Sequence, residues 1–173
     1  YLLTMYILLM VLKIPWRIAV LGSIAFAFST YLLIILQVGH NTKALAISYI
    51  PLVVAGLVLL RQNKILPGFL VSLFAISLQI RANHYQMTYY MLILLGIYFI
   101  VYLVDSYRKK DLKEYLKYIG VFALAGILSL GLNAPDILST YDYSKYSTRS
   151  QSELTLNPDG TEKERTTGLD YDY

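Results

Sequence analysis

The first 104 residues of the chain contain no aspartate or glutamate, although they include several long runs of apolar side chains. All 11 acidic residues follow, beginning with Asp105. A soluble domain carries about 25% charged residues, whereas this chain carries 15% and is 57% hydrophobic. Long acid-free apolar runs are what the hydrocarbon interior of a bilayer requires. The sequence therefore predicts an integral membrane protein.

Six apolar runs approach the length that crosses a bilayer, which is about 20 helical residues for roughly 30 Å of hydrocarbon. Short polar or basic segments separate the runs, which are residues 1–12, 18–38, 44–60, 65–80, 87–104 and 118–132. The first run has no initiator Met or charged leader, so we expect a truncated span and a longer protein that continues on both sides. The predicted fold class is an all-α, polytopic transmembrane helix bundle of about six spans.

The composition changes after the sixth run. Residues 1–135 form the predicted transmembrane region, in which residues 105–117 are a charged connector. Residues 136–173 form a polar tail, and the turn signal at residues 157–160 indicates that it contains a short hairpin. Because its apolar content is too low for a core of its own, we expect the tail to fold only against the membrane region or against missing parts of the protein.

Basic residues are distributed unequally between alternate loops. Segments 13–17, 61–64 and 105–117 carry two, two and five Lys or Arg, whereas segments 39–43 and 81–86 carry one each. Alternate loops lie on opposite sides of a membrane, and the basic loops are the cytoplasmic ones. The first set is therefore predicted to be cytoplasmic, and the tail, by parity, is predicted to be extracytoplasmic.

Several function classes find no support in the sequence. The net charge of +4 does not indicate nucleic-acid binding, because the basic residues cluster between apolar runs. The absence of cysteine excludes disulfides and thiolate metal sites. No zinc signature, P-loop, dinucleotide fingerprint or serine-nucleophile elbow occurs, so no metal ligand is predicted and the cofactor is left unknown.

The predicted orientation places both histidines of the chain on the outer face. His40 and Asn41 stand where a membrane helix begins. They form either an interfacial turn with a helix cap or part of a polar cleft that binds a phosphate or a sugar hydroxyl. Imidazole can also transfer a proton near neutral pH.

Residues 81–86 contain five polar side chains in six positions. Gln79, Asn83 and Gln86 would share one face if the helix continued through this segment. Arg81 suits a lipid-linked phosphate, because guanidinium pairs with phosphate in a fixed fork; lipid headgroups or an ordinary loop are the alternatives. The predicted substrate-binding residues are His40, Asn41, Arg81, Asn83, His84 and Gln86.

Asp136 is the only carboxylate immediately at the outer end of a predicted span. It is either a turn or cap residue after Pro135 or a candidate catalytic base for a sugar hydroxyl. Because residues 1–104 offer no acid, an enzyme that uses a carboxylate would take it from Asp136 or from residues before Tyr1.

Several segments are similar to a known family. Gly-His-Asn-Thr-Lys at 39–43, Ala-Asn-His-Tyr-Gln-Met-Thr-Tyr-Tyr at 82–90 and Tyr-Ser-Thr-Arg at 146–149 resemble large YfhO-like bacterial membrane proteins. The resemblance implies a GT-C type glycosyltransferase of the cytoplasmic (inner) membrane. Such enzymes transfer a sugar from a polyprenyl-phosphate donor to a cell-envelope acceptor at the outer membrane face. Their catalytic acid usually lies in a first large outer loop that this chain lacks, so no catalytic residue is carried over.

Two other functions remain open. A transporter or flippase of lipid-linked glycans would have polar residues at mid-membrane and discontinuous helices. A non-catalytic membrane scaffold would bind a partner through the polar tail. The lipid bilayer is the partner that all three functions share.

Overall fold

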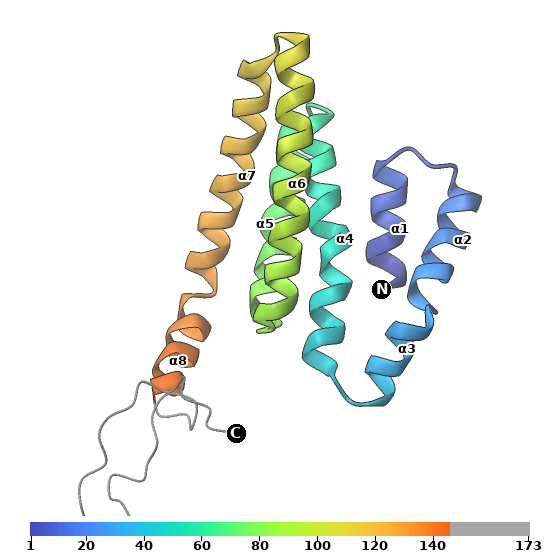
Figure 1. Cartoon of the computed structure of the whole chain (residues 1–173), viewed down its shortest axis with the longest axis vertical. Helices are drawn as coiled ribbons and strands as arrows, with labels where there is room; N and C mark the ends of the chain where they lie inside the picture. Colours follow the sequence, from blue (N-terminus) through green and yellow to red (C-terminus); the bar gives the residue numbers. More distant parts are fainter. Residues whose placement is uncertain (146–173) are drawn as a thin grey trace, which may run out of the picture. The chain divides into compact units, whose positions relative to one another are not determined.

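The structure is a computed structural model that describes residues 1–145, and all of the regular structure in this range is helical (Figure 1). The predicted all-α class is confirmed. The helices are α1 Leu2–Val11, α2 Trp16–Ala27, α3 Thr30–Gln37, α4 Asn41–Arg61, α5 Ile65–Arg81, α6 Tyr85–Lys109, α7 Leu112–Leu132 and α8 Ala134–Lys145. The chain divides into two compact units, the first ending at Asn133 and the second beginning with α8.

Three of the described helices, α4, α6 and α7, are long and apolar enough to cross a membrane, with 21, 25 and 21 residues. Helices α2 and α3 would add a fourth span if they are taken together. Helices α1 and α5 are apolar but shorter. The structure therefore supports three spans, or up to four, by length and composition, and the total of six stays a prediction.

The run 18–38, predicted as one span, is broken in the structure. Helix α2 ends at Ala27, and α3 begins at Thr30 with its axis turned by 46°. Ser29 stands at the break with extended backbone angles (φ −60°, ψ 140°). Serine and threonine side chains compete for backbone hydrogen bonds and so favour helix ends over helix interiors. Two such residues in succession favour a helix end at this point, although the Ser29 side chain makes no cap hydrogen bond.

The connector predicted over residues 105–117 is instead mostly helical. Helix α6 continues to Lys109, and only Lys110 and Asp111 separate it from α7. Ion pairs one helical turn apart support both ends: Lys109 Nζ lies 2.9 Å from Asp105, and Lys117 Nζ lies 3.3 Å from Glu114. Such pairs, together with the high helix propensity of Lys, Arg and Glu, stabilise helical ends.

The first part of the predicted polar tail is also helical, because α8 extends to Lys145. Pro135 lies in the first turn of α8, where a missing N–H is tolerated. The predicted hairpin around residues 157–160 lies outside the described residues.

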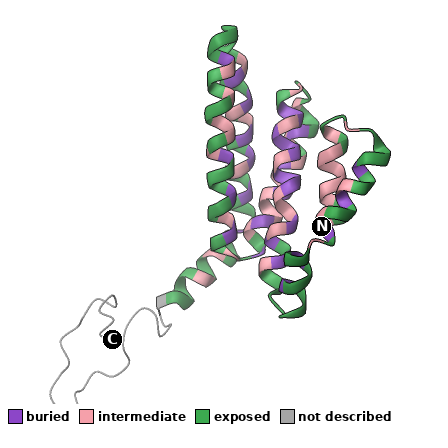
Figure 2. Ribbon diagram, turned by 45° about the vertical axis from the view of Figure 1, so that its right-hand side comes forward, coloured by how far each residue is buried: buried purple, intermediate pink, exposed green. Residues whose placement is uncertain are grey.

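Helix α4 is the centre of the first unit, since it packs against α1, α3, α5, α6 and α7. Two thirds of the most apolar stretch of α4 is buried, compared with 17% of the corresponding stretch of α6. Figure 2 shows that buried residues lie where the helices face one another, while the outer sides are exposed. The main core consists of Leu52, Val53, Leu57, Leu60, Ala75, Met91, Leu95, Tyr118 and Phe122. The exposed apolar sides of α6 and α7 suit contact with lipid.

Small residues allow α4 and α5 to approach closely. A Cβ atom added to Gly56 would overlap the Ser72 hydroxyl and lie 2.9 Å from the Ser72 backbone N. A Cβ atom added to Gly68 would lie 2.8 Å from the backbone N of Leu60. Close backbone approach at small residues is a common way to pack helices in a membrane, where the hydrophobic effect between helices is absent.

Five of the six connections between the seven helices of the first unit are tight turns, and each of the five contains one residue with left-handed backbone angles. These residues are Lys13, Gly39, Asn63, Asn83 and Lys110. At the α4–α5 turn, the Lys64 N–H donates to the Leu59 carbonyl (3.0 Å), and the Asn63 N–H donates to the Leu60 carbonyl (2.9 Å). This paired pattern satisfies the last carbonyls of a helix and reverses the chain. As a result the helices run alternately up and down, except that α3 continues in the general direction of α2 (Figure 1).

Candidate functional site

The two histidines occupy equivalent positions in the fold. His40 is the N-cap residue of α4, and His84 is the N-cap residue of α6. Both helices begin at the same end of the first unit (Figure 1). A helix N-terminus presents unpaired backbone N–H groups and a partial positive charge. Neither first turn contains an acidic residue that would offset this charge.

The two imidazoles differ in what they contact. Nδ1 of His84 accepts a hydrogen bond from the Met87 N–H at 3.4 Å, an arrangement that suits the tautomer with its hydrogen on Nε2. His84 is half-buried, whereas His40 is exposed and makes no side-chain cap bond. The predicted turn with a helix cap at His40 and Asn41 has His40 as its N-cap residue, while Asn41 is already the first helical residue. Helix α4 therefore begins at Asn41, directly after the turn at Gly39 and His40.

Arg81 is the last residue of α5, and its side chain is exposed. Asn83 is exposed in the turn that follows, with φ +50°. Because α5 ends at Arg81 and α6 begins at Tyr85, no continuous helix places Gln79, Asn83 and Gln86 on one face. Gln86 is instead exposed in the first turn of α6, where its Nε2 donates to the Tyr90 hydroxyl at 3.0 Å.

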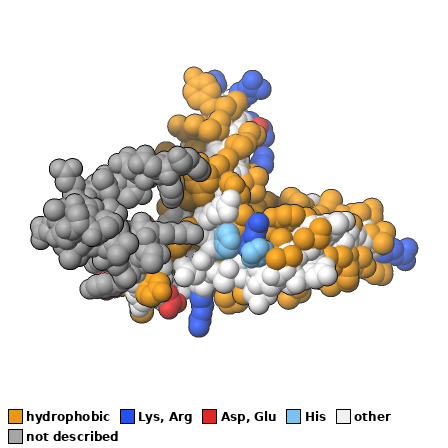
Figure 3. Space-filling view, turned by 60° about the horizontal axis from the view of Figure 1, so that its bottom comes forward, with side chains coloured by type: hydrophobic (Ala, Val, Ile, Leu, Met, Phe, Trp, Pro, Cys, Tyr) orange, Lys and Arg blue, Asp and Glu red, His pale blue; other side chains and the backbone are white. Residues whose placement is uncertain are grey.

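Apolar packing joins the start of α4 to the α5–α6 turn. Ala46 of α4 forms a buried cluster with Ala82 and with Met87 of α6. Arg81, Asn83, His84 and Gln86 therefore belong to one turn, which packs beside the helix that His40 begins. Figure 3 shows both histidines (pale blue) on the surface at this end, with a basic side chain (blue) beside them in this view.

Asp136, the candidate catalytic base, lies in the second unit. It is exposed in the first turn of α8, and its carbonyl oxygen accepts a hydrogen bond from the Thr140 hydroxyl at 2.8 Å. An acidic side chain in a first turn favours the helix dipole. The described contacts of Asp136 are thus those of a helix start.

Buried polar residues near this end were not predicted as functional. Gln79 is fully buried, and its Nε2 donates to the Thr88 hydroxyl at 3.3 Å. Its Oε1 has no hydrogen-bond partner among the described residues. Asn133 donates to the Ser77 hydroxyl and to the Ser129 carbonyl, both at 2.8 Å. The only sequence signal for Gln79 was a single amide near the end of an apolar run.

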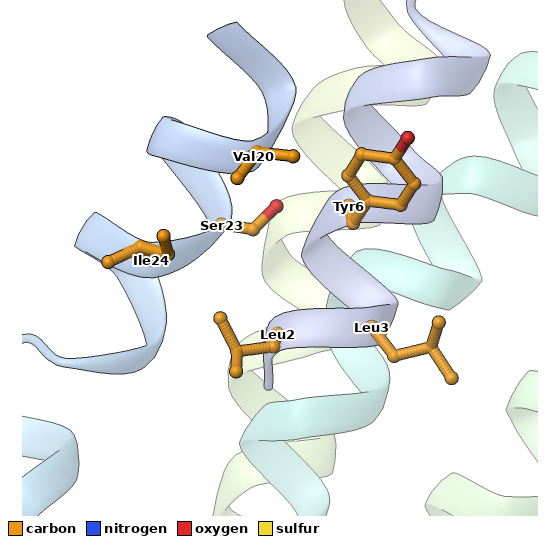
Figure 4. Close-up of a pocket in the computed structure, with 6 residues that line it drawn as sticks. All are labelled: Leu2, Leu3, Tyr6, Val20, Ser23 and Ile24. Carbon is orange, nitrogen blue, oxygen red and sulfur yellow. The ribbon is translucent and has the colours of Figure 1, made fainter. Parts of the chain in front are cut away.

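A separate pocket of about 310 Å³ lies between α1 and α2 (Figure 4). Its lining residues are Leu2, Leu3, Tyr6, Val20, Ser23 and Ile24. The Ser23 hydroxyl donates to the Ala19 carbonyl at 2.6 Å, and the lining supplies no carboxylate, imidazole or cation. The polar chemistry of the first unit therefore lies at its ends and not in this pocket. Within residues 1–145, no three His, Asp or Glu side chains are grouped so that they could hold a metal ion.

Strongly apolar helices of spanning length, joined by tight polar turns, define a multi-pass membrane protein. Residues 1–160 match the family described as bacterial membrane protein YfhO. The chain therefore belongs to the YfhO family of bacterial membrane proteins, and the resemblance seen in its sequence is confirmed. No curated protein and no solved structure matches the chain.

Proposed function

We propose that the chain is part of a GT-C type glycosyltransferase of the bacterial cytoplasmic membrane. In this proposal the protein transfers a sugar from a polyprenyl-phosphate donor to a cell-envelope acceptor at the outer face. The observation that carries the proposal is the combination of two histidine-capped helix N-termini with Arg81 at one end of the unit. Membership of a family of bacterial membrane proteins supports the part of the proposal that places the protein in a bacterial membrane.

The chemistry of the donor matches the groups at this end. The Arg81 guanidinium would pair with the donor phosphate, because it is a permanent cation with a fixed fork of donors. The unpaired N–H groups at the start of α6 and the Nε2–H of His84 would donate to the remaining phosphate oxygens. Asn83, Gln86, His40 and Asn41 supply further donors and acceptors for a sugar. The catalytic carboxylate would come from Asp136 or from residues beyond this chain.

One observation favours a second candidate, a transporter or flippase of lipid-linked glycans. The break between α2 and α3 is the kind of helix discontinuity on which transporters build binding sites. The same segment contains no ionisable side chain between Ile18 and Val38 other than Tyr31. Transporter sites at mid-membrane typically hold charged or ion-coordinating groups, so the transferase remains the better supported of the two.

Binding of polyprenyl phosphate to the full-length protein in nanodiscs tests the proposed phosphate contact. Arg81→Ala should weaken binding roughly tenfold or more, because a charge-assisted hydrogen bond contributes about 1.5–3 kcal/mol. Arg108→Ala is the matched control, since it removes an exposed arginine at the opposite end, and it should leave binding unchanged. Equal binding by wild type and Arg81→Ala would contradict the proposal.

A second assay separates the two candidates. The full-length protein is supplied with a donor that carries a radiolabelled sugar, and the label is followed into the acceptor. Transfer of the label supports the glycosyltransferase. Movement of the intact lipid-linked glycan across a vesicle membrane without transfer would support the transporter instead.

A further inference from the structure

The end of the first unit opposite the histidines is formed by three turns, α1–α2, α4–α5 and α6–α7, which we call the basic end (Figure 1). The α4–α5 turn holds the other two turns together. Gln62 Nε2 donates to the carbonyl of Val11 at 2.7 Å, and Asn63 Oδ1 accepts from Lys117 Nζ at 3.3 Å. Cations that are far apart in the sequence are thereby gathered on one surface.

Ion pairs divide the cations of the basic end into two groups. Asp105 pairs with Arg61 at 3.3 Å and with Lys109 at 2.9 Å, while Glu114 pairs with Lys117. Asp111 is a third acid at this end. Six further cations are exposed and form no ion pair within the described part of the chain: Lys13, Arg17, Lys64, Arg108, Lys110 and Lys113. We call these the free cations. They leave a surface of excess positive charge that the chain itself does not neutralise.

The backbone provides a separate indication that charge matters at this surface. Lys13 and Lys110 have left-handed backbone angles, with φ +61° and +58°. The other three turns place Gly39, Asn63 and Asn83 at the equivalent position, and these residue types adopt such angles at lower cost. Two free cations thus occupy positions where lysine is conformationally unfavourable. A residue held in an unfavourable conformation points to a function for its side chain.

Exposed aromatic side chains accompany the free cations. Trp16 is 59% exposed beside Arg17, whose guanidinium lies 5.4 Å from the indole ring centre, and Tyr107 is 76% exposed beside Arg108. Tryptophan and tyrosine at the ends of membrane helices lie at the level of the lipid headgroups. The free cations are therefore at the depth of the phosphates of the surrounding bilayer.

We infer that the basic end binds the headgroups of anionic phospholipids in the leaflet that surrounds it. The partner follows from charge complementarity, because the cations of the basic end outnumber its acids, Asp105, Asp111 and Glu114, and basic clusters beside membrane helices attract anionic lipid. The inference concerns the end opposite the proposed donor site, so it does not depend on the proposed function.

Trp16 is the only tryptophan of the chain, so its fluorescence reports on the basic end alone. The chain is reconstituted in phosphatidylcholine bilayers that contain an equal mole fraction of either brominated phosphatidylglycerol or brominated phosphatidylcholine. For the wild type, quenching by the anionic lipid should exceed quenching by the zwitterionic lipid about twofold or more. The ratio should fall towards one at about 1 M salt, where the Debye length is about 3 Å.

Two double variants locate the effect. Lys13→Gln with Lys64→Gln should lower the quenching ratio to about one. Lys43→Gln with Arg81→Gln removes the same charge at the histidine end and should leave the ratio at its wild-type value. A wild-type ratio of one would overturn the inference, as would an equal fall in both variants, which would make net charge alone responsible. The salt titration uses only the wild type, so the test does not depend on how the variants fold.

Discussion

Lys110 has an energetically unfavourable backbone conformation at a turn. Its left-handed angles end α6 and allow α7 to begin two residues later. Glycine has no Cβ atom and adopts these angles readily, whereas a left-handed residue with a side chain costs about 1–2 kcal/mol. The local sequence is therefore not optimised for stability at this position.

The substitution Lys110→Gly should raise the free energy of unfolding by up to about 1 kcal/mol, because the relief of strain exceeds the extra entropy of the unfolded glycine. Lys113→Gly is the matched control, since it removes the same charge from a helical position. It should lower stability by about 1 kcal/mol. SDS titrations of the purified chain in zwitterionic micelles, followed by helical circular dichroism, measure both. A loss of stability in Lys110→Gly would contradict the account of this turn.

Individual residues were predictable from the sequence where the polar pattern interrupts an apolar run. The pattern placed His40 and the segment 81–86 at turns; the structure has a turn at His40 and confines the second turn to residues 82–84. It did not identify Gln79 as a fully buried residue bonded to Thr88. A linear sequence does not say which side of a short apolar helix faces its neighbours, and that side determines whether an amide is buried.

At the scale of elements, the contact between α4 and α5 depends most on glycine. Among the helix contacts of the described part of the chain, it leaves the least space for a Cβ atom at its glycines. Gly56 faces the backbone of Ser72, which cannot move independently of α5. The half-buried Gly96 of α6 has open space where its Cβ atom would lie. The two positions therefore separate the effect of close packing from the effect of helix propensity.

We expect Gly56→Ala to lower the free energy of unfolding by about 1–3 kcal/mol, because the new methyl group overpacks the interface. Gly96→Ala should instead raise it by up to about 1 kcal/mol through helix propensity. Thermal denaturation in detergent, followed by circular dichroism, compares the two. Stabilisation by both substitutions would show that α4 and α5 do not pack as closely as described.

Hydropathy located the elements but not their boundaries. The apolar run 18–38 has the composition of one span, yet Ser29 and Thr30 divide it into α2 and α3. The charged segment 105–117 has the composition of a loop, yet ion pairs along the helix surface keep most of it helical. An average over a window registers neither two successive residues that favour helix ends nor ion pairs along a helix surface.

At the scale of the whole molecule, tight turns alternate between the two ends of the first unit (Figure 1). Most of the basic residues are gathered at one end, and both histidines are at the other (Figure 3). The alternation of the turns between the two ends could be predicted from the sequence. The helices are too apolar to leave the bilayer, so each polar turn between them must reverse the direction of the chain. The chemistry at the histidine end could be predicted only as residue types, since a linear sequence does not say which side chains the turns bring together.

The central claim is that the histidine end faces the outside of the cell and the basic end faces the cytoplasm. Because the chain has no cysteine, His40→Cys and Lys110→Cys in the full-length protein each introduce one known thiol into this segment. Intact cells are treated with a membrane-impermeant maleimide, with any cysteines elsewhere in the protein replaced. The account predicts that His40→Cys is labelled and that Lys110→Cys is labelled only after the membrane is permeabilised. Labelling of Lys110→Cys in intact cells, with His40→Cys protected, would contradict it.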